Sequence, residues 1–167
     1  MNSFRFLTER SVETLLKAYD RYNILIFTHG RNDNSTDTVV DISLKSYSEA
    51  YPQIDTDESY SIMIPDSNDA IQIKAATVYG ALRALESLSQ LVYYDFDTQQ
   101  YAITGTPITV QDAPRYQHRG MLLDTARHYQ PISALKRTID ALSYAKYNVL
   151  HWHAVDTQVH MHAYIHT

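Results

Sequence analysis

The chain has 167 residues, of which 44% are hydrophobic and 20% are charged, and its formal net charge is −5. This composition is typical of a globular protein, and the mildly acidic balance provides neither a basic face for nucleic acid nor a polybasic patch for a membrane surface. No apolar run in the sequence approaches the length that spans a bilayer. The chain has no cysteine, so it forms neither a disulfide framework nor a thiolate metal site.

The N-terminal segment predicts a helix without a secretory signal before it. Residues 1–7 contain a few apolar side chains, but the polar residues 8–10 interrupt any signal core. Residues 11–22 have helical spacing of apolar positions, and Ser11 is a candidate N-cap. The predicted apolar face consists of Val12, Leu15, Leu16 and Tyr19.

Strand and hairpin patterns follow. Residues 38–44 and 58–64 alternate between apolar and polar side chains, and a PDSND turn leads from the second of these into residues 70–75 as a hairpin. Thr77 is a candidate N-cap for a second helix. The apolar stripe of that helix consists of Val78, Leu82, Leu85, Leu88, Leu91 and Val92. Residues 1–110 are therefore predicted to form an α+β domain, with an antiparallel-rich sheet and two helices.

A linker and a βαβ unit complete the chain. Residues 111–117 are predicted to be the linker. They overlap the proline-flanked stretch 107–114, which also holds a short extended piece at 108–110. Residues 120–124 form a short apolar run typical of a strand buried on both faces. A helix with Ser133 as its candidate N-cap follows, and strand character returns at 147–153. Such a unit has parallel strands and a right-handed connection.

Polar residues follow both strands of this unit, where functional groups gather in α/β proteins. The first strand is followed by Asp124, Arg127 and His128, and the second by His153, Asp156 and Gln158. Taken alone, Arg127 is about as consistent with a solvated surface residue or an ion-pair partner as with a functional group. The coincidence of two polar strand ends favours a functional site.

Two motifs carry a resemblance to a known family. HRGMLLDTARHY (118–129), followed by NVLHWHAVDTQ (148–158), resembles the opening of the catalytic domain of the family-20 β-N-acetylhexosaminidases. Upstream, residues 77–92 resemble the helix that closes the small N-terminal domain of those enzymes. The similarity runs in the right order and spacing from about residue 10 to residue 158.

The resemblance implies a fold, a substrate class and site residues. Residues 118–158 would begin an incomplete (β/α)8 TIM barrel with one βαβ unit, and the substrates would be glycans that end in N-acetylhexosamine. Arg127 matches the arginine that holds hydroxyls of the terminal sugar. Asp156 matches the aspartate that supports the acid glutamate through a histidine. No cofactor and no metal are implied.

Several positions depart from the family pattern. Members are typically lysosomal or secreted, with a signal peptide and an extra strand before the first helix, and both are expected to be missing here, which leaves localisation open. Thr157 stands where a second acidic residue is frequent. His151 and His153 are expected to be buried, hydrogen-bonded groups beneath the site. Family members often dimerise, but this sequence does not indicate an oligomeric state.

The end of the chain limits the expected activity. Residues 159–167 do not resemble the family, and no Asp-Glu pair follows Gln158, so the chain by itself is expected to be an inactive fragment that lacks the general acid. One alternative is a metal-binding module, because HxH spacing is a ligand pattern for zinc or copper. Its ligands would come from His151, His153, Asp156, His160, His162 and His166. The other alternative is a non-functional fragment of a mispredicted gene.

Overall fold

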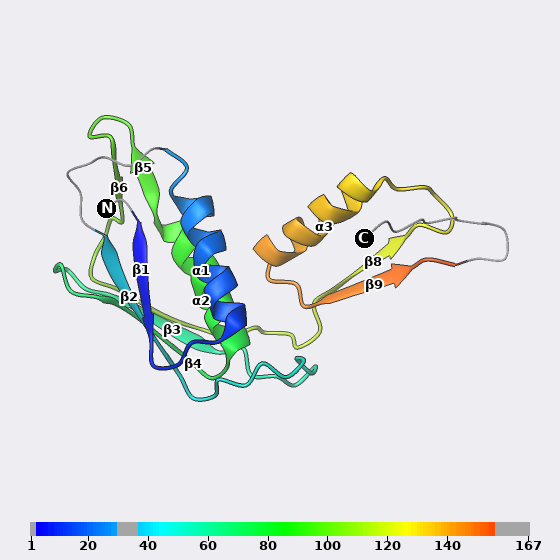
Figure 1. Ribbon diagram of the computed structural model, residues 1–167, viewed down its shortest axis with the longest axis horizontal. Helices are drawn as coiled ribbons and strands as arrows, with labels where there is room; N and C mark the ends of the chain where they lie inside the picture. Colours follow the sequence, from blue (N-terminus) through cyan, green and yellow to red (C-terminus); the bar gives the residue numbers. More distant parts are fainter. Residues whose placement is uncertain (1–2, 30–36, 156–167) are drawn as a thin grey trace. The chain divides into compact units, whose positions relative to one another are not determined.

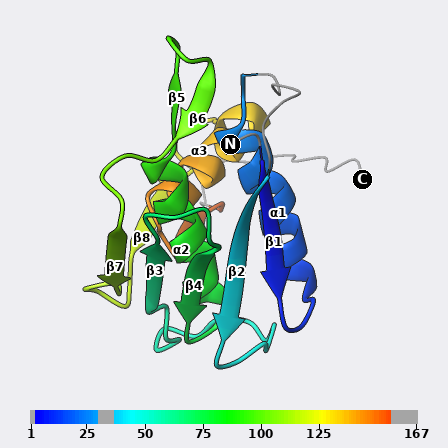
Figure 2. The ribbon, with the colours of Figure 1, turned by 90° about the vertical axis from the view of Figure 1, so that its left-hand side faces the viewer.

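A five-stranded sheet with two helices on one face forms the first part of the chain (Figures 1 and 2). The computed structural model describes residues 3–29 and 37–155. It divides into two units, residues 1–115 and 116–167, and the division falls inside the segment predicted to be a linker. Each unit is described by itself.

The sheet of the first unit is mixed, with strand order β1-β2-β4-β3-β7. β1 pairs parallel with β2 and β2 parallel with β4, whereas β3 pairs antiparallel with both β4 and β7. The prediction of an antiparallel-rich sheet is therefore wrong. The 71–75 strand pairs antiparallel with its hairpin partner but parallel with the 38–44 strand, so that two of the four strand pairs are parallel. The strands are β1 (Phe4–Thr8), β2 (Thr38–Leu44), β3 (Tyr60–Ile64), β4 (Ile71–Ala75) and β7 (Ile108–Asp112).

β1 corrects a second expectation, that the strand before the first helix is missing. Phe4 is only 3% exposed and joins the core. The ring of Phe6 stacks on Tyr19 at a centroid distance of 4.4 Å. These five residues gain their strand partners only from β2, more than thirty positions away. The alternation of side chains within five residues is too weak a signal to predict an edge strand of this length.

Helices α1 (Glu13–Ile26) and α2 (Val78–Leu91) cover one face of the sheet, and Figure 2 shows both behind the strands. The apolar stripe predicted for α2 is confirmed: Val78, Leu85 and Leu88 are at most 1% exposed. A buried hydrogen bond joins the two helices, because the hydroxyl of Tyr22 donates to Glu86 Oε2 at 2.9 Å. Among the described residues of this unit, no helix lies over the other face of the sheet, which is therefore its open face.

The helix starts test the predicted caps. Thr77 is confirmed, because its hydroxyl oxygen accepts the backbone N–H of Gly80 at 3.2 Å. Ser11 is wrong: α1 has Val12 at its N-cap position and no side-chain cap bond. Ser133 is also wrong, because α3 (Ile132–Tyr144) begins one residue before it, with Pro131 at the N-cap. The ring of Pro131 restricts its own φ angle at the start of the helix, and no side chain accepts a hydrogen bond there.

A two-stranded hairpin, β5 (Tyr93–Asp95) and β6 (Gln100–Ala102), extends beyond α2 and was not predicted. Its turn is held by Asp95, whose carboxylate accepts the N–H groups of residues 97 and 98. Tyr101 ties the hairpin to the end of α1, since its hydroxyl accepts the N–H of His29 at 2.6 Å. Three-residue strands are too short for their alternation to indicate a strand.

The second unit is the predicted βαβ arrangement. β8 (Gly120–Asp124) and β9 (Val149–His153) pair in parallel, with α3 between them in the sequence. The burial of β8 on both faces is wrong: Met121 is 41% and Leu122 58% exposed, and no residue of α3 is buried. Within residues 116–155 only one helix and one strand accompany β8, too little apolar surface to cover it. No helix in the described part of the chain is both long and apolar enough to cross a membrane.

Gly80 offers a test of the close approach between α2 and the loop before β3. A Cβ at this position would lie 2.7 Å from the backbone oxygen of Ser59. Alanine forms helices better than glycine by about 1 kcal/mol. The contact of its Cβ with the Ser59 oxygen is too short, however, and can be relieved only if the backbone moves. We therefore expect Gly80→Ala to lower the free energy of unfolding by about 1–3 kcal/mol. Urea denaturation followed by circular dichroism measures it, and a gain in stability would contradict so close an approach of these two segments.

Candidate active site

The parallel pairing of β8 and β9 brings their carboxyl ends to one edge of the small sheet. Asp124, the last residue of β8, lies directly opposite His153, the last residue of β9. Residues that follow these strands therefore begin side by side, as the sequence predicts for Arg127 and His128 after β8. Asp156 and Gln158, predicted to follow β9 at the same edge, lie outside the described residues.

Asp124 organises the turn that carries Arg127. Its Oδ1 accepts the backbone N–H groups of Ala126 and Arg127 at 3.0 and 3.1 Å. Its Oδ2 accepts a guanidinium N–H of Arg127 at 2.6 Å. The backbone hydrogen bond from Arg127 is the largest cause that holds the pKa of Asp124 below its ordinary value, and the guanidinium lowers it further. The carboxylate of Asp124 thus holds both the backbone N–H and the guanidinium of Arg127.

The guanidinium of Arg127 is bound by Asp124 and is still reachable from solvent. Its side chain is 67% exposed, whereas that of Asp124 is 19% exposed. Arginine presents five N–H donors in a rigid fork and keeps its charge at every relevant pH. Such a fork can bind a ligand that presents adjacent oxygen acceptors.

Thr125 locks the ends of the two strands together, and the sequence did not single it out. It is 1% exposed, and its backbone N–H donates to the carbonyl of His153 at 3.0 Å. Its hydroxyl oxygen accepts the indole N–H of Trp152 at 2.9 Å. The signal that could have found it is a hydroxyl residue just past one strand, together with a tryptophan near the end of the neighbouring strand.

The other arginine of this sheet has a structural role. Arg119 lies at the amino ends of the strands, where its side chain donates to the carbonyls of Lys146 and Tyr116 at 2.7 and 2.8 Å. Asn148 completes this junction by accepting the N–H of Arg119 and donating to the carbonyl of Gln117. The two arginines thus mark opposite ends of the small sheet, and only Arg127 lies at the end where polar residues gather.

The histidines do not match their predicted setting. His151 is exposed and His153 only half-buried, so the expectation that both are buried beneath the site is wrong. The cause is the same lack of cover that exposes β8. Among residues 3–29 and 37–155, no group of three histidine or carboxylate side chains is close enough to hold a metal ion. The remaining histidines of the metal hypothesis, His160, His162 and His166, lie outside that part, so the hypothesis stays a prediction.

Comparison with protein families decides the assignment. Residues 5–91 match the family model described as "beta-acetyl hexosaminidase like", and residues 116–163 match that of the glycosyl hydrolase family 20 catalytic domain. The chain belongs to the β-hexosaminidases of glycosyl hydrolase family 20. The match to the catalytic domain extends to residue 163, five residues into the segment that was expected not to resemble the family.

Individual relatives agree with this family. The chain is 47% identical over 160 residues to β-hexosaminidase subunit B2 of Dictyostelium discoideum, covering 93% of this chain and 28% of that protein. It is 45% identical over 120 residues to the human β-hexosaminidase subunit beta, covering 72% and 21%. The structure resembles the Flavobacterium johnsoniae chitobiase with a TM-score of 0.72 at 29% identity, covering 94% of this chain and 24% of that one. The chain spans less than a third of the length of these family members.

The Asp124 carboxyl gives a direct test of the turn. Because its pKa is lowered in the folded chain, it stabilises the fold above its ordinary pKa, and this contribution is lost as the pH falls through the lowered value. We expect Arg127→Ala to raise the pKa of Asp124 part of the way, since both backbone donors remain. Carbon-detected NMR titration measures it. Arg137→Ala, on the exposed face of α3, is the control and should leave it unchanged. An ordinary pKa in the unsubstituted chain would disprove this hydrogen-bonded turn.

Proposed function

We propose that this chain supplies the N-terminal domain and the first βαβ unit of a (β/α)8 barrel in a β-N-acetylhexosaminidase that removes terminal N-acetylhexosamine from glycans. The observation that carries the proposal is the anchored, exposed Arg127 at the carboxyl end of β8, within the segment that matches the catalytic domain of the family. Active sites of (β/α)8 barrels lie at that end of the strands. The family names of the relatives support the substrate class.

In this proposal Arg127 binds the substrate. Its fork donates hydrogen bonds to two neighbouring hydroxyls at the non-reducing end of the terminal sugar, while Asp124 holds the side chain in place. Because Asp124 Oδ2 already restrains the guanidinium of Arg127, less side-chain entropy is lost when the sugar binds. Asp124 is thus a positioning residue, and Arg127 is the group that touches the sugar.

The reaction itself would be substrate-assisted, an exception to the use of two protein carboxylates. The acetamido oxygen of the sugar attacks the anomeric carbon, and the glycosidic bond breaks as a protein acid protonates the leaving oxygen. Water then opens the cyclic intermediate with retention. The acid and its neighbouring aspartate would be an Asp-Glu pair beyond Gln158, and residues 159–167 contain none. We therefore propose that residues 1–167 alone do not catalyse hydrolysis.

Asp156 would act through another residue. Three positions past His153, the last residue of β9, it would accept a hydrogen bond from a histidine elsewhere in the complete enzyme. That contact fixes the tautomer of the histidine, which in turn tunes the proton donor. The match of residues 116–163 to the catalytic domain supports this assignment.

Turnover tests the role of Arg127. Residues 1–167 should release no 4-nitrophenol from its β-N-acetylglucosaminide, whereas a longer protein that completes the barrel should. In that longer protein Arg127→Ala should lower kcat/KM at least about 100-fold, because two charged hydrogen bonds of about 1.5–3 kcal/mol each are lost. Arg137→Ala should change it little. Equal losses in both variants, or full activity of Arg127→Ala, would refute the assignment.

The pH profile tests the role of Asp156. In the longer protein Asp156→Asn should lower kcat about 10–100-fold and shift the limb of the kcat profile that reports the proton donor. KM should change little, since Asp156 does not touch the sugar. Asp140→Asn on α3 is the control. A loss of activity with an unshifted pH profile would assign Asp156 a merely structural role.

A further inference from the structure

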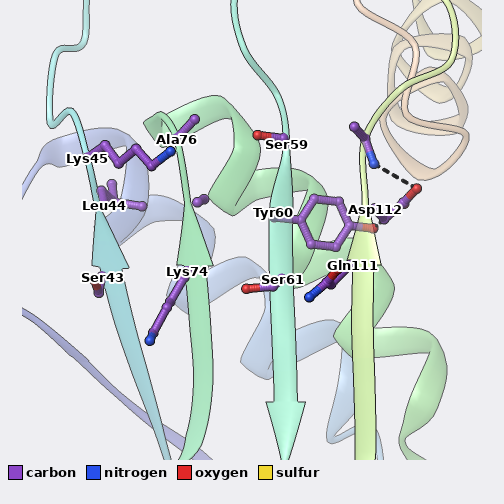
Figure 3. A pocket seen from close by; sticks show the side chains of 12 residues that line it. Ser43, Leu44, Lys45, Ser59, Tyr60, Ser61, Lys74, Ala76, Gln111 and Asp112 are labelled. Atoms are coloured by element: carbon purple, nitrogen blue, oxygen red, sulfur yellow. Dashed lines mark hydrogen bonds between the residues drawn. The ribbon is translucent and has the colours of Figure 1, made fainter.

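The open face of the five-stranded sheet carries a row of polar side chains in register. Ser43 on β2 lies opposite Lys74 on β4, and Lys74 lies opposite Ser61 on β3. Ser61 in turn lies opposite Gln111 on β7. Side chains directly opposite one another in a sheet have Cβ atoms about 4.5–5.5 Å apart. The ammonium group of Lys74 thus projects from between two hydroxyls, with an amide next in the row (Figure 3).

These four residues line a hollow of about 590 Å³ at that part of the sheet. Lys45, at the end of β2, also lines it and extends across β4 in Figure 3. A volume of this size is within the range of about 300–1,000 Å³ found for small-molecule sites. The hollow lies wholly within residues 1–115, away from the β8 and β9 strand ends in the sequence.

The polar groups of the row are not used by the fold. In the part of the chain that the structure describes, none of the side chains of Ser43, Lys74, Ser61 and Gln111 makes a hydrogen bond or ion pair with another protein group. All four can donate hydrogen bonds, and the one charge among them is positive. The row thus carries a positive charge on a chain whose formal net charge is −5.

Within the described ranges of the chain, none of the carboxylates near the row forms an ion pair with Lys74. Asp112 lines the hollow at the β7 edge, but it accepts the hydroxyl of Tyr60 at 2.6 Å and the N–H of Ala113 at 2.9 Å. Asp57 lies near Lys45 and is hydrogen-bonded by Ser59, so it offsets the charge of Lys45 rather than that of Lys74. Asp41 belongs to the next row, opposite Gln72.

We propose that this hollow binds an anionic sugar, one that carries a sulfate ester or a carboxylate. The anion lies on the ammonium of Lys74, and the hydroxyls of Ser43 and Ser61 and the amide of Gln111 bind the ring hydroxyls. A simple anion would leave most of these groups without a partner. Nucleic acid does not fit, because two lysines on an acidic chain cannot offset its charge. The choice of a glycan rests on the proposed function, but the site itself is separate from Arg127.

Titration of residues 1–167 tests the inference. The probes are N-acetylglucosamine 6-sulfate, glucuronic acid, neutral N-acetylglucosamine and sodium sulfate. Amide NMR and calorimetry measure the binding of each. The two anionic sugars should shift the amides of residues 43, 61, 74 and 111. Lys74→Gln should weaken their binding at least about tenfold, the effect of losing one charged hydrogen bond. Neutral sugar should bind this face much more weakly.

Lys17→Gln is the matched control, because it removes the same charge from the exposed side of α1, where Lys17 pairs with Glu13. It should leave the binding unchanged. The inference is wrong if the four amides do not shift, if Lys17→Gln weakens binding as much as Lys74→Gln, or if sodium sulfate binds as tightly as the anionic sugars. These binding results do not depend on turnover, so they stay separable from a failure of the proposed hydrolase activity.

Discussion

The candidate site depends on one carboxylate at the end of β8. Asp124 accepts three donors within 3.1 Å, two from the backbone of the turn and one from the guanidinium of Arg127. The arginine is therefore placed by the strand and not by a free loop, and the strand is placed by its register with β9. Hydrogen bonds to a charged acceptor are stronger than those between neutral groups. The anchor can thus persist although Arg127 is largely exposed to water.

The two units differ in what stabilises them. The first has a continuous core, in which Leu15, Ile62 and Ile73 are fully buried between the helices and the sheet. The second has no buried residue on α3, and its described contacts are mainly backbone pairing and polar junctions at both strand ends. Hydrophobic burial stabilises the first unit, at about 25 cal/mol per Å² of apolar surface. Such burial is scarce in the second, where apolar residues of both strands face solvent.

The sequence was sufficient for much of the first unit because its signals are local. The strand at 38–44 has the predicted bounds, and the stripe and cap of α2 follow from residues within the helix itself. Two departures from the prediction in this unit share a non-local cause. β1 becomes a strand only beside β2, and the extended piece at 108–110 becomes the edge strand β7 only beside β3. Neither partner can be identified from the pattern of the short strand alone.

The same limit applies to the site. The position of Arg127 follows from strand topology, because every residue just past a parallel strand lies at that edge of the sheet. The contact between Thr125 and Trp152 requires the register as well, and a shift by two residues would separate them while leaving every strand in place. Once Asp124 is opposite His153, Thr125 and Trp152 lie on adjacent strands within one residue of that pair. The register between β8 and β9 is therefore the information that the sequence does not provide. It brings the indole N–H of Trp152 within hydrogen-bond distance of the Thr125 hydroxyl, two residues before Arg127.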